Sequence, residues 1–134
     1  MNNKIDLNFV KENLINYFKK HKEILFAYIF GSQVSKKANK LSDIDIAIYA
    51  DVEKIDEKDY RYGYNAEILS DIMSLLGTNK VDLALLNFAK PLLRHRVIYF
   101  GELIYCINDK ERINFQVDTI NKYVNYKMLL RKIS

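Results

Sequence analysis

The sequence has few of the residues that mark cross-linked, linker-rich or membrane-embedded chains. Its single cysteine, Cys106, excludes an internal disulfide, which favours a reducing compartment and predicts a cytoplasmic protein. One proline and four glycines leave no recognisable linker, so we expect a single domain over residues 1–134. No apolar run approaches the roughly 20 residues that span a bilayer, and the first residues lack a signal-peptide pattern. We therefore expect no membrane association.

An excess of charge of one sign is also small. The chain holds 21 Lys and Arg against 17 Asp and Glu, for a net charge of +4. This net positive charge is compatible with an anionic ligand. No basic block interleaved with aromatic residues is present, so we expect no direct nucleic-acid partner. The histidines and Cys106 lack the spacing of a zinc site, and no G-x-x-x-x-G-K-S/T loop of P-loop enzymes occurs.

Apolar residues, by contrast, make up 49% of the chain, which is enough for a packed core. Residues 43–50 alternate apolar and other side chains, as in a strand, whereas the segments predicted as helices repeat apolar residues at three- and four-residue steps. The predicted elements are a helix at 7–21, strands at 23–30 and 43–50, a helix at 60–77, a strand at 80–87, a helix at 90–101, a strand at 102–108 and a helix at 109–134. This order predicts a mixed α/β (α+β) domain, with a small sheet packed with helices.

Two of the predicted strands carry aspartates on one side. Asp43 and Asp45 point the same way because side chains repeat every two residues, and Asp82 lies opposite Val81 and Leu83 on a later strand. Neighbouring carboxylates repel, and a cation such as Mg²⁺, which prefers oxygen ligands, would neutralise them. If the strands are neighbours, three carboxylates meet and could hold two metal ions for phosphoryl transfer. Taken alone, the pair Asp43 and Asp45 is more often a solvated strand edge or a cap, and Asp82 alone could be an exposed edge residue.

A Gly-Ser step follows the first predicted strand. Gly31 allows a tight turn and a close backbone approach to a ligand, and Ser32 adds a hydroxyl that suits a phosphate. The loop beyond it carries Lys36, Lys37 and Lys40, which could offset triphosphate charge. An ordinary turn and a solvated loop explain these residues as well when each is taken alone.

Taken together, the stretch "GSQVSKKANKLSDIDIAIYA" at residues 31–50 resembles the G-S-x(10)-D-x-D signature of the DNA polymerase β-type nucleotidyltransferase superfamily. The small size and the later "KVDLALLN" look like minimal nucleotidyltransferase (MNT) domains. The segments "PLLRHRVIYFGELIYCIND" and "YVNYKMLLRKIS" look like the MntA-type antitoxins that are paired with HEPN-domain toxins. The resemblance therefore covers nearly the whole chain, most specifically through its first motif.

The resemblance implies roles for five residues. Gly31 and Ser32 match the motif that binds the nucleotide triphosphate. Asp43 and Asp45 match the metal-binding pair, and Asp82 matches the third carboxylate, which helps to bind metal and to activate the acceptor hydroxyl. The implied cofactor is Mg²⁺, with two ions expected, and the implied substrate is ATP.

The implied function is transfer of AMP from ATP to a tyrosine of a HEPN RNase toxin, which silences the toxin. The sequence departs from the family pattern at Gln33, where many members carry Arg or Tyr, and at residues 35–37, where a second glycine is usual. These departures keep open an antitoxin that blocks its partner by binding alone, with a vestigial nucleotide site. Transfer to a small molecule is disfavoured because the chain has no room for an acceptor domain.

Two further features of the sequence are not assigned a catalytic role. Arg94 and Arg96 do not share a helix face, and one of them could reach a phosphate or an acidic partner, although ordinary surface charge is the favoured interpretation. His95 has no metal-binding companion in the sequence. In the last predicted helix, one apolar stripe is expected to cover the domain's own sheet, and a second group is a possible partner surface. The stripe comprises Ile113, Val117, Ile120, Val124, Met128 and Ile133, and the second group comprises Tyr123, Tyr126, Leu129 and Leu130.

Overall fold

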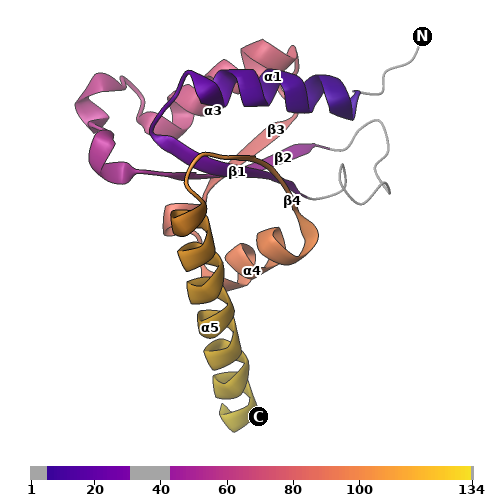
Figure 1. The fold of residues 1–134 in the computed structure, drawn as a ribbon, viewed down its shortest axis with the longest axis vertical. Coiled ribbons are helices and arrows are strands. Elements are labelled where there is room, and N and C mark those ends of the chain that lie inside the picture. The colour runs from indigo at the N-terminus through magenta and orange to yellow at the C-terminus, as the bar shows by residue number, and fades with distance from the viewer. Residues whose placement is uncertain (1–5, 31–42, 134) are drawn as a thin grey trace.

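The computed structural model describes residues 6–30 and 43–133, and its elements follow the predicted order (Figure 1). The helices and strands are α1 (Leu7–Lys19), β1 (Ile24–Phe30), β2 (Ile44–Ala50), α3 (Tyr64–Leu76), β3 (Val81–Leu85), α4 (Pro91–Phe100), β4 (Glu102–Cys106) and α5 (Asp109–Ile133). Short 3₁₀ turns lie at Val52–Lys54, Glu57–Asp59 and Leu86–Phe88. The prediction of a mixed α/β fold is confirmed.

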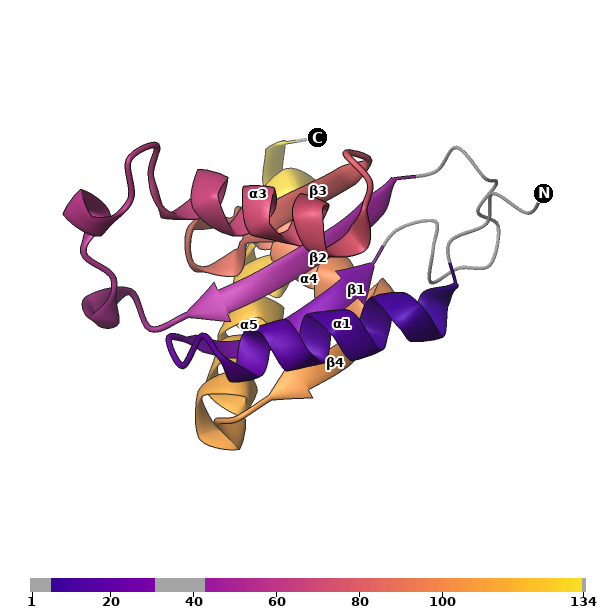
Figure 2. The same cartoon turned by 90° about the horizontal axis from the view of Figure 1, so that it is seen from above.

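The strands form a four-stranded sheet in the order β3-β2-β1-β4 (Figure 2). Strand β1 is central and pairs antiparallel with both β2 and β4. Strands β2 and β3 pair in parallel, which requires a crossover connection, and α3 provides it. The parallel pair is the feature that brings distant parts of the sequence side by side.

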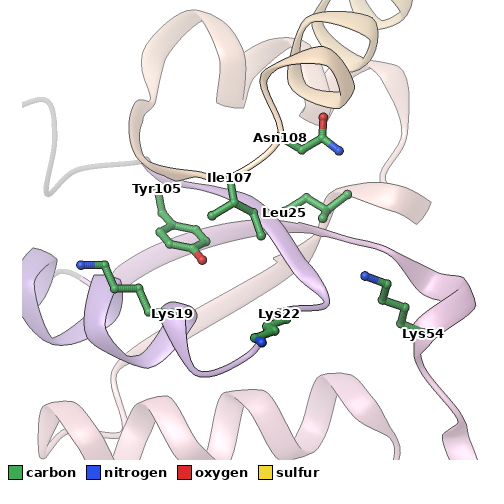
Figure 3. Close-up of a pocket in the computed structure, with 7 residues that line it drawn as sticks. All are labelled: Lys19, Lys22, Leu25, Lys54, Tyr105, Ile107 and Asn108. Carbon is green, nitrogen blue, oxygen red and sulfur yellow. The ribbon is translucent and has the colours of Figure 1, made fainter.

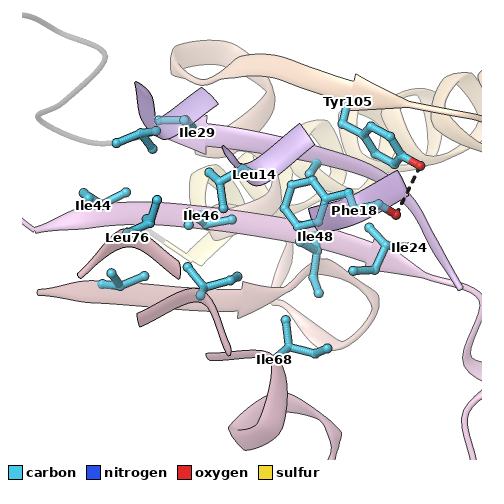
Figure 4. Close-up of a cluster of buried hydrophobic side chains, with 14 of the residues drawn as sticks. Leu14, Phe18, Ile24, Ile29, Ile44, Ile46, Ile48, Ile68, Leu76 and Tyr105 are labelled. Atoms are coloured by element: carbon cyan, nitrogen blue, oxygen red, sulfur yellow. Dashed lines mark hydrogen bonds between the residues drawn. The ribbon is translucent and has the colours of Figure 1, made fainter. Parts of the chain in front are cut away.

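Helices cover both faces of this sheet, α1 and α3 on one and α4 and α5 on the other (Figure 1). The alternation of β2 explains the division, because Ile44, Ile46 and Ile48 pack toward α1 and α3 while Ala47 and Tyr49 face α4 and α5. Figure 4 shows the larger core, in which α1 and α3 bury one residue in each turn. The buried residues of these two helices are Val10, Leu14, Phe18, Tyr64, Ile68, Ile72 and Leu76.

Two side-chain hydrogen bonds hold the layer formed by α1 and α3 together. The Tyr17 hydroxyl donates to Asp71 at 2.6 Å, and the Tyr64 hydroxyl donates to Glu23 at 2.7 Å. Burial and the hydrogen bond to the carboxylate both raise the pKa of each tyrosine above its usual value. These tyrosines therefore remain protonated donors throughout the physiological range.

Helix α3 begins four residues later than predicted. Gly63, which precedes it, has φ 91°, a left-handed conformation that ends any helix arriving from residue 60. The Glu57 carboxylate then accepts a hydrogen bond from the Tyr64 backbone N–H at 3.0 Å, so the helix starts at a side-chain cap from the preceding turn.

The prediction that the apolar stripe of the last helix covers the sheet is wrong. The stripe predicted to cover the sheet is exposed, and α5 packs on its own domain through Phe115 and Thr119 instead. Phe115 contacts the rings of Phe26 and Tyr49 at centroid distances of 5.5 and 5.3 Å. Helical spacing fits both sides of α5, so only the sheet's aromatic surface decides which side is buried.

Candidate functional site

The parallel pairing of β2 with β3 places Asp45 directly opposite Asp82. Each aspartate lies two residues before an alanine, Ala47 in β2 and Ala84 in β3, that faces α4 and α5. Side chains two residues apart in a strand share a face, so both aspartates project to the face covered by α4 and α5. Asp43 lies two residues before Asp45, just ahead of β2. Asp45 is half-buried, whereas Asp43 and Asp82 are exposed, so the carboxylates sit where the covered face opens to solvent.

The electrostatics at Asp45 follow from this arrangement. Burial, then the charges of Asp82 and Asp43, raise the pKa of Asp45 to about 6. A hydrogen bond between the Asp45 and Asp82 carboxyl groups, which needs a proton on one of them, acts in the same direction. The ion pairs found between described residues include none of the three aspartates. The described structure therefore holds negative charge here without a cationic side chain beside it.

This donor set has the chemistry that a hard divalent cation requires, because carboxylate oxygens with unbalanced charge are the ligands Mg²⁺ prefers. Within residues 6–30 and 43–133, however, no three His, Cys, Asp or Glu side chains are grouped closely enough to hold a metal ion. The structure shows a carboxylate pair with a third aspartate two residues away. Gly31 and Ser32, predicted to bind the triphosphate, lie outside the described residues, as do Lys36, Lys37 and Lys40.

The next strand brings an aromatic residue to the same sheet end, which sequence reasoning missed. Phe30, the last residue of β1, is the register partner of Asp45. The end of α4 packs on it: a Cβ added to Gly101 would lie 3.3 Å from the Phe30 Cβ. Tyr99 and Phe100, which precede Gly101, are largely exposed. Only strand pairing reveals this neighbourhood, because local sequence indicates no more than a short helix.

Arg94 corrects an interpretation made from sequence. Its guanidinium is not ordinary surface charge, since the side chain is only 12% exposed and donates to the Asn87 carbonyl at 2.7 Å. It faces the Asp118 carboxylate at 3.6 Å and lies over the Phe115 ring, 5.1 Å from the centroid. Arg94 thus joins α4 to α5, and its acidic partner belongs to the same chain.

A separate cavity of about 520 Å³ lies at the other end of β1 (Figure 3). Its lining includes Leu25, near the start of β1, whereas Asp45 pairs with the last residue of that strand. A seven-residue strand spans roughly 20 Å, so the cavity is remote from the aspartates. The lining residues are Lys19, Lys22, Leu25, Lys54, Tyr105, Ile107 and Asn108.

None of the helices in the described part of the chain combines the length and hydropathy that a bilayer crossing requires.

The small mixed sheet, through its parallel strand pair, sets two aspartates side by side at one end, an arrangement suited to holding a divalent cation. A sequence model of the family described as polymerase beta, nucleotidyltransferase matches residues 12–110. The chain therefore belongs to the polymerase β nucleotidyltransferase family. No curated protein matches the sequence significantly.

Solved structures of toxin–antitoxin complexes contain chains with the same fold. A chain from a toxin–antitoxin crystal structure with AMP-PNP is 24% identical, with TM-score 0.74 over 92% of this chain and 94% of that chain. A chain from the toxin–antitoxin MntA-HepT is 23% identical, with TM-score 0.69 over 94% of each. A third structure contains a tri-AMPylated Shewanella oneidensis HEPN toxin in complex with an MNT antitoxin. Its matching chain is 23% identical, with TM-score 0.70 over 94% of this chain and 93% of that chain.

Proposed function

We propose that this protein is an antitoxin adenylyltransferase, which transfers AMP from ATP to a tyrosine hydroxyl of a cognate HEPN RNase toxin and so neutralises it. The observation that carries the proposal is the parallel register of Asp45 and Asp82 in a nucleotidyltransferase-family domain. The acceptor is suggested by a structural neighbour in which an MNT antitoxin accompanies a tri-AMPylated HEPN toxin. The nucleotide is suggested by the neighbouring complex with AMP-PNP.

The proposed site divides into carboxylates and a phosphate-binding turn. The paired carboxylates of Asp45 and Asp82 would hold Mg²⁺, and Asp43, two residues before Asp45, is proposed to join them when the ion binds, because none of the three has a basic side chain paired with it among the described residues. Bound Mg²⁺ would supply charge stabilisation for the phosphates and for the departing pyrophosphate. Gly31 and Ser32, which directly follow β1 in the sequence, are proposed to bind the triphosphate.

The reaction forms one bond and breaks one. The tyrosine oxygen attacks the α-phosphorus of ATP, the bond from that phosphorus to its bridging oxygen breaks, and pyrophosphate leaves. Asp82, the more exposed member of the carboxylate pair, is proposed to accept the hydroxyl proton from a protein substrate that arrives from solvent. The remaining contribution of the chain is to position both reactants on a rigid sheet end.

The test uses Asp45→Asn and Asp82→Asn, each co-expressed with the HEPN toxin. Both changes keep side-chain size but remove a carboxylate, so AMP transfer from α-labelled ATP should fall about a hundredfold or more. Intact-mass spectrometry of the toxin measures the added AMP. Asp59→Asn, at an exposed position in the 3₁₀ turn Glu57–Asp59, is the matched control and should transfer AMP normally.

A second outcome would favour the non-catalytic alternative. If the wild-type protein suppresses toxin activity while the toxin carries no AMP, the protein acts by binding alone. Undiminished AMP transfer by both asparagine variants would instead exclude the assigned carboxylates.

A further inference from the structure

The C-terminal part of α5 extends beyond the rest of the domain. Tyr123 still stacks on His95 of α4, with ring centroids 3.6 Å apart. Every residue from 124 to 133 is exposed, and Figure 1 shows this end of the helix standing clear of the sheet and of α4. Ten residues extend about 15 Å at 1.5 Å per residue. We call this segment the overhang.

An exposed apolar row, the outer stripe, runs along α5 into the overhang. Its members are Ile113, Val117, Ile120, Val124 and Met128, each 48–53% exposed. At 100° per residue the row lies roughly 140° around the helix from Thr119, which faces the domain. Single exposed apolar residues are common, but a continuous row of about 22 Å is typical of an interaction surface.

The side of α5 that faces the domain also stays apolar after the domain ends. The row that buries Phe115 and Thr119 continues as Tyr126, Leu130 and Ile133, all exposed. The overhang is therefore apolar on two nearly opposite sides. A helix that is apolar on opposite sides is stable when it lies between other elements, whereas a short isolated helix is marginal in water.

The charge of α5 decides which occupant fits. The helix carries six basic and three acidic residues, and no acidic residue follows Asp118. Two copies of α5 would bring like net charge together, so self-association is disfavoured. A membrane surface suits a helix with one apolar and one polar face, which the two opposite rows of the overhang do not provide. Acidic residues around an apolar protein groove would complement this helix.

We infer that the outer stripe and the overhang form a docking element for a protein partner that offers an apolar groove between helices, rimmed by acidic side chains. The identity of that partner as the HEPN toxin rests on the proposed function. Helix α5 covers the face of the sheet to which Asp45 and Asp82 project. A partner bound to α5 therefore lies on the same side of the sheet as the carboxylates.

The test is a neutral polar variant of the stripe, Val117→Gln/Ile120→Gln/Val124→Gln. These side chains are half-exposed and Gln is a good helix former, so the fold should persist, which circular dichroism and thermal unfolding check. Affinity for the toxin is measured by calorimetry without nucleotide, which separates docking from AMP transfer. We expect Kd to weaken about tenfold or more.

Matched controls come from exposed aliphatic residues elsewhere. Val52→Gln/Ile107→Gln removes two exposed aliphatic side chains outside α5 and should leave the toxin Kd unchanged. Lys127→Gln/Lys132→Gln should slow association and reduce its salt dependence, because it removes positive charge from the overhang.

The outcomes are distinguishable from those of the catalytic proposal. Unchanged toxin affinity in the stripe variant overturns the inference. The inference is also overturned if the chain alone forms a dimer in sedimentation, or binds mixed phosphatidylcholine–phosphatidylserine vesicles, and the stripe variant abolishes that dimer or that binding. Stripe-dependent toxin binding without any AMP transfer would support the docking element and contradict the proposed function.

Discussion

At the scale of a single residue, Asp45 is held where its ionised form is unfavourable. It belongs to a strand with two covered faces, and its carboxylate lies beside a second carboxylate on β3. Burial and like charge make its ionised form unfavourable, which is why its pKa rises to about 6. A folded protein keeps such a group when a cation or a proton relieves it, so the residue is better explained by ligand binding than by stability.

The raised pKa of Asp45 predicts that the stability of the fold depends on pH when divalent cations are absent. Because the folded pKa of Asp45 exceeds its ordinary value of 3.8, the protonated form favours folding. That contribution is fully present below pH 3.8 and is lost as the pH rises through about 6. Asp82→Asn removes the nearest like charge and should lower the Asp45 pKa, as measured by NMR titration of the carboxyl carbon. Asp59→Asn should not change it, and an unshifted Asp45 pKa in Asp82→Asn would contradict the coupling.

At the scale of elements, the join between α4 and β4 sets how closely α4 approaches the end of β1. Gly101 caps α4, and its backbone N–H donates to the Val97 carbonyl at 2.8 Å. Phe30 packs against the same point, one strand away from Asp45. The end of α4 therefore approaches β1 through its backbone, and no space is left for a side chain at Gly101.

We expect Gly101→Ala to destabilise the fold by about 2 kcal/mol, within the range of overpacked sites. Its Cβ would lie 2.3 Å from the Val97 carbonyl oxygen, so the end of α4 has to shift. Urea denaturation measures the change in the free energy of unfolding.

Gly77→Ala is the contrasting substitution. Gly77 ends α3 at φ 68°, and a Cβ there would meet nothing within 4 Å, so its cost is backbone strain of about 1 kcal/mol. If Gly101→Ala proved as mild as Gly77→Ala, the close fit of α4 against β1 would be incorrect.

At the scale of the whole molecule, α5 has two parts with different roles. Its first half belongs to the core through Phe115, which is buried against the aromatic face of the sheet. Its second half, beyond Tyr123, is exposed throughout. The domain should therefore fold without the overhang, whose residues are explained by a partner.

Deleting residues 124–133 should leave the thermal midpoint of the remaining domain within a few degrees of the intact chain, because no buried side chain is lost. Phe115→Ala, in contrast, should cost about 3–5 kcal/mol through loss of packing and creation of a cavity. Calorimetry of the two variants makes the comparison. A large loss of stability on deletion would mean that the overhang contributes to the fold itself.

Sequence reasoning reached the elements because their signals are local. The alternation of Ile44, Ile46 and Ile48 reflects a strand between two layers. Three- and four-residue spacing predicted the first helix, which the structure shows as α1 with Val10, Leu14 and Phe18 buried. It failed where choices depended on distant partners. The buried side of α5 follows from the aromatic surface of the sheet, and the pairing of Arg94 with Asp118 follows from how α4 and α5 pack together.

The sequence by itself determined the alternation of elements, the mixed α/β class and the placement of aspartates on one side of two strands, because period and spacing are properties of a short stretch of chain. Only the tertiary structure decided that β2 and β3 are parallel neighbours, which sets Asp45 against Asp82. It also decided that the apolar row of α5 faces solvent. Strand pairing and helix docking depend on long-range contacts, and these exist only once the chain has folded.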